Sequence, residues 1–157
     1  MNEQTKRFTN RSVIITGAAG GIGSALSRRF LSEGAKVCAV DLKTETLDKL
    51  ALDLGFPAEL MTVEADISSE ESCRNLSAQV KEKWGAVDIL VNNAGWFPFT
   101  AFEEISYAEW RKVCAVNLDS TFLITRAILP LMKSSQAQPQ ILRKQFVRLT
   151  CGANLIQ

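Results

Sequence analysis

The sequence of 157 residues contains no histidine and only one tyrosine, Tyr107. Without histidine, no Ser-His or Cys-His pair can form a nucleophile, and a metal site would lack the commonest metal ligand, so we expect no metal. The four cysteines include no CxxC pair, which argues against a zinc-binding or redox motif. We interpret the cysteines as mostly small buried side chains in a reducing compartment.

An excess of charge and a long apolar run are also missing. The 18 basic and 17 acidic residues leave a net charge of +1, which indicates no general attraction to nucleic acid or membranes. No run approaches the roughly 18 apolar residues of a membrane span. The polar start, residues 1–11, lacks the apolar core of a secretion signal. We therefore expect a cytoplasmic protein with no nucleic-acid or membrane partner.

What the sequence does contain is a strand, a glycine-rich turn and a helix near its start. Residues 13–15 are β-branched and predict a buried parallel strand, while Ile22, Leu26 and Phe30 recur at helical spacing. Between them lies TGAAGGIG, residues 16–23. Its glycines would let the backbone approach a pyrophosphate, which the first helical amides would then face. A tight turn without a ligand gives the same pattern, so the motif alone leaves both interpretations open.

Strands and helices alternate along the rest of the chain. Strands are predicted over 36–40, 60–64 and 87–91, with helices over 47–54, after a capping box with Ser68 as N-cap, and from a second capping box at Ser106. This alternation predicts an α/β fold, a three-layer doubly wound parallel sheet of the Rossmann type with strand order 3-2-1-4-5. At this length, residues 1–157 fit a single domain.

Asp41 ends the second predicted strand, 18 residues beyond Gly23. A dinucleotide-binding unit places a carboxylate here to bond the ribose hydroxyls, and its negative charge would repel a 2′-phosphate. This position favours NAD(H) over NADP(H), although the nearby Lys43 weakens the preference. The alternative is that Asp41 caps the helix that follows.

Asparagines stand at two further places where apolar residues would be expected. The sequence NNAG, residues 92–95, follows the fourth predicted strand, where paired amides can tie neighbouring strands and line a crevice; an ordinary turn is the alternative. Asn117 stands inside the long helical stretch that starts at Ser106. It is interpreted either as a buried side chain that holds a water or stabilises a kink, or as a surface residue.

Taken together, these motifs resemble the short-chain dehydrogenase/reductase family over residues 10–133 in one collinear series. The resemblance implies an oxidoreductase that moves hydride between a nicotinamide dinucleotide and a small alcohol or carbonyl substrate. It implies roles at the pyrophosphate for the motif glycines, at the ribose for Asp41, and at the adenine for Asp66 and Ile67. The implied cofactor-binding residues are Thr16, Gly17, Gly21, Ile22, Gly23, Asp41, Leu42, Asp66, Ile67, Asn92, Asn93, Ala94 and Gly95. Asn117 resembles the family's catalytic asparagine, which positions a water in a proton relay, and the helices around 101–133 resemble those that form homo-oligomers.

The last part of the sequence departs from this family. In the family, a serine follows the fifth strand, and a Tyr-x-x-x-Lys pair beyond the serine supplies the general acid/base. Tyr107 precedes Asn117 and is interpreted as a helix residue, so the pair is absent from the chain. Residues 134–157 form a diverged tail, and a possible fifth strand over 145–150 would place Cys151 at the serine position; the alternative is a strand-end residue without a catalytic role.

We therefore expect the cofactor-binding half of an NAD(H)-dependent oxidoreductase, truncated before its general acid. The alternatives are a catalytically silent module that binds NAD or a partner, and a non-functional truncated product.

Overall fold

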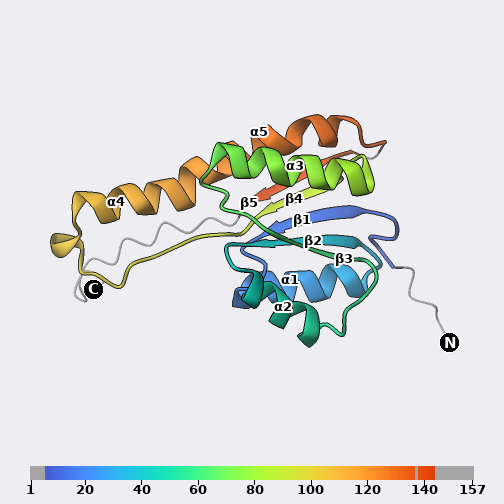
Figure 1. Ribbon diagram of the computed structural model, residues 1–157, viewed down its shortest axis with the longest axis horizontal. Coiled ribbons are helices and arrows are strands. Elements are labelled where there is room, and N and C mark those ends of the chain that lie inside the picture. Colours follow the sequence, from blue (N-terminus) through green and yellow to red (C-terminus); the bar gives the residue numbers. More distant parts are fainter. Residues whose placement is uncertain (1–5, 137, 144–157) are drawn as a thin grey trace, which may run out of the picture.

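The computed structural model describes residues 6–136 and 138–143, and its centre is a five-stranded parallel sheet (Figure 1). The strand order is β3-β2-β1-β4-β5, so the predicted order 3-2-1-4-5 is confirmed. The strands are β1 Ser12–Thr16, β2 Lys36–Asp41, β3 Leu60–Glu64, β4 Ile89–Asn92 and β5 Gln140–Arg143. The helices are α1 Gly21–Ser32, α2 Thr44–Asp53, α3 Glu70–Trp84, α4 Tyr107–Cys114 and α5 Ser120–Lys133, with a 3₁₀ turn η1 Phe102–Glu104 and a π-helical turn η2 Ala115–Asp119.

Helices cover both faces of the sheet, with α1 and α2 on one face and α3 and α5 on the other (Figure 1). Successive residues of a strand point to opposite faces, and β1 serves both. Val13 and Ile15 belong to the apolar cluster under α1 and α2. Ile14 belongs to the cluster that includes Ile124 of α5. Because both faces are buried, the strand reads as a continuous β-branched run rather than an alternating one.

The start of α3 differs from the prediction by one residue. The N-cap is Ser69, whose Oγ accepts a hydrogen bond from Ser72 N at 3.3 Å. The predicted cap, Ser68, instead donates its hydroxyl to Asp66 Oδ1 at 2.6 Å. Asp66 therefore takes the hydroxyl that the capping pattern assigned to the helix.

The fifth strand lies earlier in the chain than expected. It is Gln140–Arg143, which pairs in parallel with β4 from Ile89↔Gln140 to Asn92↔Arg143. The predicted range 145–150 lies outside the described residues, and so does Cys151. At the start of β5, Gln140 N donates to the carbonyl of Asp88, the residue before β4, at 2.9 Å. This bond starts the pairing before the segment that was expected to form the strand.

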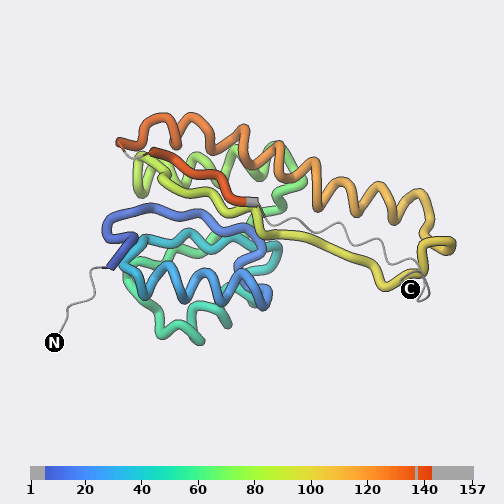
Figure 2. Tube along the Cα trace, turned by 180° about the vertical axis from the view of Figure 1, so that it is seen from behind, coloured from blue at the N-terminus to red at the C-terminus, as the bar shows by residue number. Residues whose placement is uncertain are grey.

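One helical stretch, Tyr107–Lys133, runs for 27 residues through α4, η2 and α5. It begins at Ser106, whose Oγ accepts from Glu109 N at 3.2 Å, as the capping box predicts. By length and composition this stretch could cross a membrane, although core helices of soluble proteins share that property. The expectation that no segment is long and apolar enough for a membrane span is therefore not supported by length and hydropathy. Figure 2 shows that α4 and the segment before it extend beyond the sheet.

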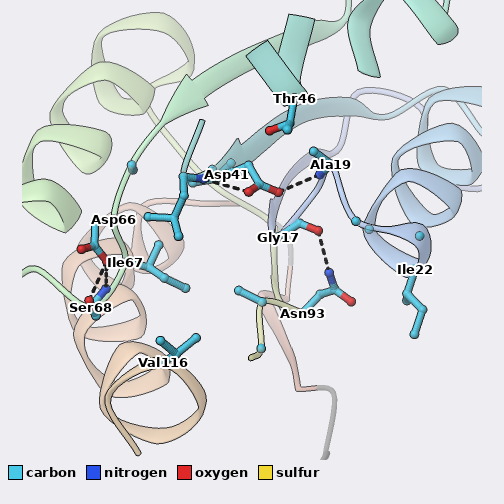
Figure 3. A pocket seen from close by; sticks show the side chains of 18 residues that line it. Gly17, Ala19, Ile22, Asp41, Thr46, Asp66, Ile67, Ser68, Asn93 and Val116 are labelled. Atoms are coloured by element: carbon cyan, nitrogen blue, oxygen red, sulfur yellow. Dashed lines mark hydrogen bonds between the residues drawn. The ribbon is translucent and has the colours of Figure 1, made fainter. Parts of the chain in front are cut away.

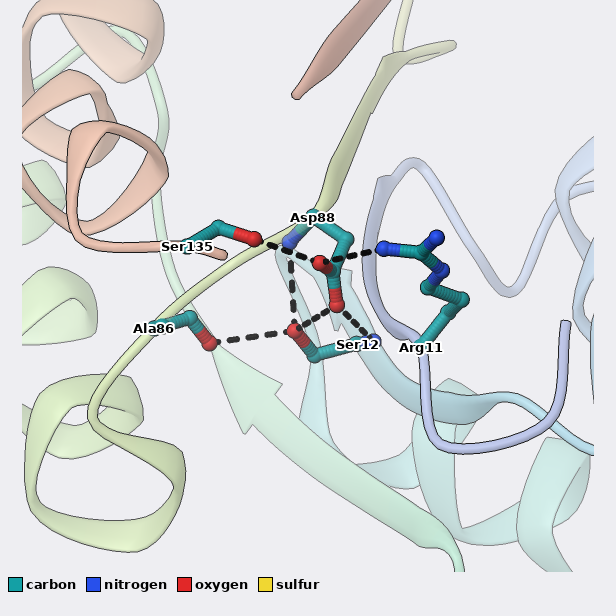
Figure 4. A network of polar contacts seen from close by, with 5 residues as sticks. All are labelled: Arg11, Ser12, Ala86, Asp88 and Ser135. Carbon is teal, nitrogen blue, oxygen red and sulfur yellow. Dashed lines mark hydrogen bonds and ion pairs between the residues drawn. The ribbon is translucent and has the colours of Figure 1, made fainter. Parts of the chain in front are cut away.

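A polar junction joins the amino ends of β1 and β4 (Figure 4). Asp88 Oδ2 accepts from Ser12 N at 2.8 Å and from Ser12 Oγ at 3.0 Å. Asp88 Oδ1 accepts from Ser135 Oγ at 2.6 Å and pairs with Arg11 at 3.3 Å. Burial raises the pKa of the Asp88 carboxyl, but these hydrogen bonds and the Arg11 charge outweigh it, so the pKa lies below its usual value.

Candidate functional site

The turn between β1 and α1 depends on glycine at two positions. Gly17 has φ +62°, and a Cβ there would lie 2.8 Å from the Cα of Ala94. A Cβ on Gly23 would lie 2.1 Å from the carbonyl oxygen of Gly17. Both contacts are with backbone atoms, which cannot move aside cheaply. The fold itself therefore requires glycine at these two positions.

Gly21 is different, because a Cβ there would meet nothing within 4 Å. It is the first residue of α1 and lines a cleft. Packing among the described residues gives no reason for glycine here, so the open space in front of Gly21 is a feature of the cleft rather than of the fold.

The cleft has a volume of about 410 Å³ and lies at the carboxyl ends of the central strands (Figure 3). This is where doubly wound sheets bind ligands, at the point where the strand order reverses. Most of the predicted cofactor-binding residues line it, namely Gly17, Gly21, Ile22, Gly23, Asp41, Leu42, Asp66, Ile67, Asn93, Ala94 and Gly95. The prediction of binding residues did not include Ala19, Gly20, Val40, Thr46, Ala65, Ser68 and Val116, which also line it. Ala19 and Gly20 belong to the glycine motif, but no sequence signal marks Val116.

Asp41 joins the glycine turn to the end of β2. Its Oδ2 accepts from Ala19 N at 2.9 Å, and its Oδ1 accepts from Leu42 N at 2.8 Å (Figure 3). The N-cap of α2 is Lys43, so the alternative in which Asp41 caps this helix is wrong. Among the described residues that line the cleft, the charged side chains are those of Asp41 and Asp66. The cleft is therefore acidic and offers no basic partner from its lining.

Two predicted residues, Thr16 and Asn92, do not line the cleft but support its wall. Thr16 Oγ1 accepts from the backbone N–H groups of Asn93 and Ala94, each at 3.1 Å. Asn93 Nδ2 donates to the carbonyls of Thr16 at 2.9 Å and Gly17 at 3.0 Å. Asn92 Nδ2 donates to Thr125 Oγ1 at 3.4 Å. The NNAG segment thus ties β4 to β1, as its position after the strand predicts, and is more than an ordinary turn.

The Oδ1 atom of Asn93 is buried and has no hydrogen-bond partner in the structure. Its orientation is fixed, because the Nδ2 group faces two carbonyl oxygens that only a donor can satisfy. Buried acceptors normally have a partner. Since Asn93 lines the cleft, this oxygen is an acceptor that a ligand hydroxyl or a water could satisfy.

Asn117 is not a surface side chain pointing to solvent. It lies in η2, where its Nδ2 donates to the carbonyl of Trp96 at 2.7 Å and its Oδ1 accepts from Trp96 N at 3.0 Å. A Cβ on Gly95 would lie 2.8 Å from this Oδ1. Glycine at position 95 therefore lets the Asn117 amide reach the backbone that leaves the cleft. Asn117 lies in the π-helical turn, but these bonds join it to Trp96, so its role at a kink or in holding a water stays a prediction.

The buried cysteines are poor nucleophiles. Burial raises the pKa of Cys38 to about 12 and, with the nearby charges of Asp66 and Glu70, the pKa of Cys73 to about 11. Both thiols are free, and Cys73 Sγ donates to the carbonyl of Ile67 at 3.3 Å. In the described part of the chain, no group of three or more His, Cys, Asp or Glu side chains could hold a metal ion.

Comparison with known proteins gives a consistent set of relatives. A family model described as short chain dehydrogenase matches residues 11–143. The meso-2,3-butanediol dehydrogenase of Serratia marcescens is 37% identical over 124 residues, which are 79% of this chain and 49% of the relative. The NADP-dependent (R)-specific alcohol dehydrogenase of Lentilactobacillus kefiri is 35% identical over 130 residues, which are 83% of this chain and 52% of the relative.

Solved structures agree with the sequence relatives. The crystal structure of a short-chain dehydrogenase/reductase described as glucose/ribitol dehydrogenase, from Brucella melitensis, aligns with a TM-score of 0.76 at 38% identity. The alignment covers 80% of this chain and 53% of that one. The chain thus spans about half the length of the relatives described here.

Proposed function

Because the chain belongs to the short-chain dehydrogenase family, we propose that it binds a nicotinamide dinucleotide in the cleft beside Gly21. It would thereby supply the cofactor-binding half of an oxidoreductase that acts on an alcohol or carbonyl substrate. The observation that carries the proposal is the open space at Gly21, where packing does not demand glycine but a closely approaching ligand does.

The residues of the cleft fit such a ligand. The amides at the start of α1 would face a pyrophosphate with the positive end of the helix dipole. Asp41 would accept hydrogen bonds from ribose hydroxyls, and Asp66 and Ile67 would lie against the adenine. The Oδ1 atom of Asn93 would gain the donor that it lacks. A bound nicotinamide would supply the capacity to accept or donate hydride.

The acidic lining supports NAD(H) rather than NADP(H). A 2′-phosphate near Asp41 would meet a negative charge, and no basic side chain of the described lining would compensate for it. One relative is named as NADP-dependent, so the preference has to come from this chain's own residues. Lys43 is the N-cap of α2 and does not line the cleft.

The chain supplies no general acid of the family's kind, and we expect little or no turnover from it alone. Tyr107 begins α4, is 78% exposed and does not line the cleft. Asn117 would position a water for proton transfer, and the assignment of Cys151 to the family's serine stays a prediction. A silent NAD-binding or partner-binding module is therefore the alternative function. Turnover of a secondary alcohol by the NAD⁺-loaded chain would exclude this alternative, whereas absence of turnover is the result expected of both.

The expected homo-oligomer and the cytoplasmic location are also proposals. The helical stretch around 101–133 exposes apolar side chains, among them Leu118 and Phe122. Such exposed residues favour association with a second copy. Light scattering after size-exclusion chromatography gives the mass directly, and a monomer at every concentration would contradict self-association.

Titration of the full 157-residue chain with NADH and NADPH tests the binding proposal. We expect saturable NADH binding and weaker NADPH binding, and Asp41→Asn should reduce the difference about tenfold, or roughly 1.4 kcal/mol. Asp48→Asn, an exposed carboxylate outside the cleft, is the matched control and should leave the ratio unchanged. Absence of NADH binding at millimolar concentration would overturn the proposal.

A further inference from the structure

Trp96, the residue that follows the cleft wall, is held at both its backbone and its ring. The Nδ2 group of Asn117 donates to the carbonyl oxygen of Trp96 at 2.7 Å, and the Oδ1 atom of Asn117 accepts from Trp96 N at 3.0 Å. The Nζ atom of Lys112 lies 4.4 Å from the centroid of the Trp96 ring, closer than Arg126 lies to Phe122 (5.4 Å) or Arg7 to Phe8 (5.6 Å). A cation within about 6 Å of an indole face is attracted to it. One helical stretch therefore fixes the whole of Trp96.

Lys112 and Asn117 reach the same residue from α4 and from the π-helical turn η2. They are five positions apart, and at 3.6 residues per turn a regular α-helix would direct them to different faces. In η2, Ser120 N donates to the carbonyl of Ala115, a bond between residues five apart. This turn begins after Lys112, whose long side chain reaches the ring from the last turn of α4, while Asn117 reaches the backbone of Trp96 from η2 itself. Both side chains thus point at Trp96.

A further contact extends this line away from the cleft. Thr100 Oγ1 donates to Glu109 Oε1 at 2.7 Å. Glu109 and Lys112 are three residues apart on α4 and so lie on one face. The segment that leaves the cleft after Gly95 is therefore bound along a single strip of the helical stretch.

We propose that Lys112 is a positioning residue for the cofactor cleft. Through the Trp96 ring it holds residues 93–95, the wall of the cleft, in the arrangement that receives the ligand. The effect on the ligand rests on the proposed function, whereas the contact between Lys112 and the ring does not. Lys112 itself does not line the cleft, so it acts only through Trp96.

The test uses the full chain with Lys112→Met, which keeps most of the aliphatic stem and removes the charge, and Lys112→Arg, which keeps a cation. The first readout needs no ligand: the indole ¹H–¹⁵N resonance of Trp96, assigned by its loss in Trp96→Phe. The second readout is the Kd for NADH. Lys112→Met should shift the resonance and raise the Kd about two- to fivefold, the size of an exposed cation–ring contact. Lys112→Arg should retain both, and the exposed Lys81→Met on α3 should change neither.

A double-mutant cycle separates positioning from a general loss of stability. In a Trp96→Leu background, Lys112→Met should have no further effect on the Kd, because the ring through which it acts is gone. An effect of Lys112→Met on the Kd in the Trp96→Leu background would overturn the proposal. So would a Trp96 resonance that does not move in Lys112→Met, or one that moves while the Kd for NADH stays constant. Lys112→Gln is the second neutral replacement if Lys112→Met misfolds. Failure of the unmodified chain to bind NADH would instead refute the proposed function, with the ligand-free resonance test still deciding the contact.

Discussion

Asp88→Ala is the sharpest test of how the sheet is held together, because the carboxylate serves two strands and the turn before a third (Figure 4). Only 13% of its side chain is exposed. Its removal leaves the Ser12 N–H, bonded at 2.8 Å, without an acceptor, while the Ser12 hydroxyl can still donate to Ala86 O at 3.0 Å. An unsatisfied buried donor costs about 1–3 kcal/mol. The lost bond from Ser135 adds about 1 kcal/mol, so we expect a total of about 2–4 kcal/mol.

Urea unfolding followed by circular dichroism measures this loss. With a slope of about 1–3 kcal/mol per molar urea for a domain of this size, the midpoint should fall by roughly 1–2 M. Ser135→Ala removes only one of the bonds and should lower the free energy of unfolding by about 1 kcal/mol. Asp48→Ala, on the exposed face of α2, is the matched control with little expected effect. A change below about 0.5 kcal/mol for Asp88→Ala, the usual range for surface substitutions, would refute the reasoning.

The same carboxylate predicts a pH dependence. Burial raises the pKa of Asp88, but the bonds from Ser135 and Ser12 and the charge of Arg11 outweigh it, so the folded pKa lies below the unfolded value. The stabilising contribution is then fully present above the unfolded pKa, about 3.9, and is lost as the pH falls through the folded pKa. The difference between the unmodified chain and Asp88→Ala should be constant from pH 7 to about 5 and should shrink below about 4. An equal difference at pH 7 and pH 3 would contradict it.

The remaining predictions concern the glycine turn and the thiols. Gly23→Ala should lower the free energy of unfolding by about 1–3 kcal/mol or more, because its Cβ would lie 2.1 Å from the carbonyl of Gly17. Gly21→Ala should leave stability unchanged or raise it by up to about 1 kcal/mol, while the Kd for NADH rises at least about tenfold; equal losses in both variants would show that Gly21 is structural. Because burial raises the pKa of Cys38 to about 12 and of Cys73 to about 11, both should react with a thiol reagent at pH 8 far more slowly in the folded chain than in urea. Mass mapping after labelling identifies the sites, and rapid labelling of Cys38 without urea would contradict its burial.

The parallel sheet could be predicted because its central strands carry a strong local signal. The first strand was predicted over 13–15 and lies within Ser12–Thr16, because a run of buried β-branched residues defines it. The fifth strand carries no such signal: Gln140–Arg143 is half polar, and its apolar Ile141 and Leu142 are about half exposed. Its place is set by pairing with β4 and by the turn that Ser135 anchors on Asp88. Such contacts between distant residues leave no periodic trace in the sequence.

Helix ends show the same limit on a smaller scale. Ser106 is the only serine or threonine of its capping box, and its side chain caps the helix in the structure. At α3 two adjacent serines compete, and the choice of Ser69 depends on Asp66, which holds the Ser68 hydroxyl. The contact between Lys112 and Trp96 could not be predicted from the sequence either, because it joins α4 to the segment after β4 and no motif marks the two residues.

Three of the four glycines of the motif show what the structure adds to the sequence prediction. The pattern treats Gly17, Gly21 and Gly23 alike, as residues that let a phosphate approach. The structure separates them, because backbone contacts require glycine at positions 17 and 23 whether or not a ligand binds. Loss of binding after substitution there would follow from a distorted turn and would say nothing about the cleft. Of these three positions, it is at Gly21, where a Cβ meets no atom within 4 Å, that loss of binding with unchanged stability reports on a ligand. The position whose glycine packing does not explain is therefore the one that tests the function.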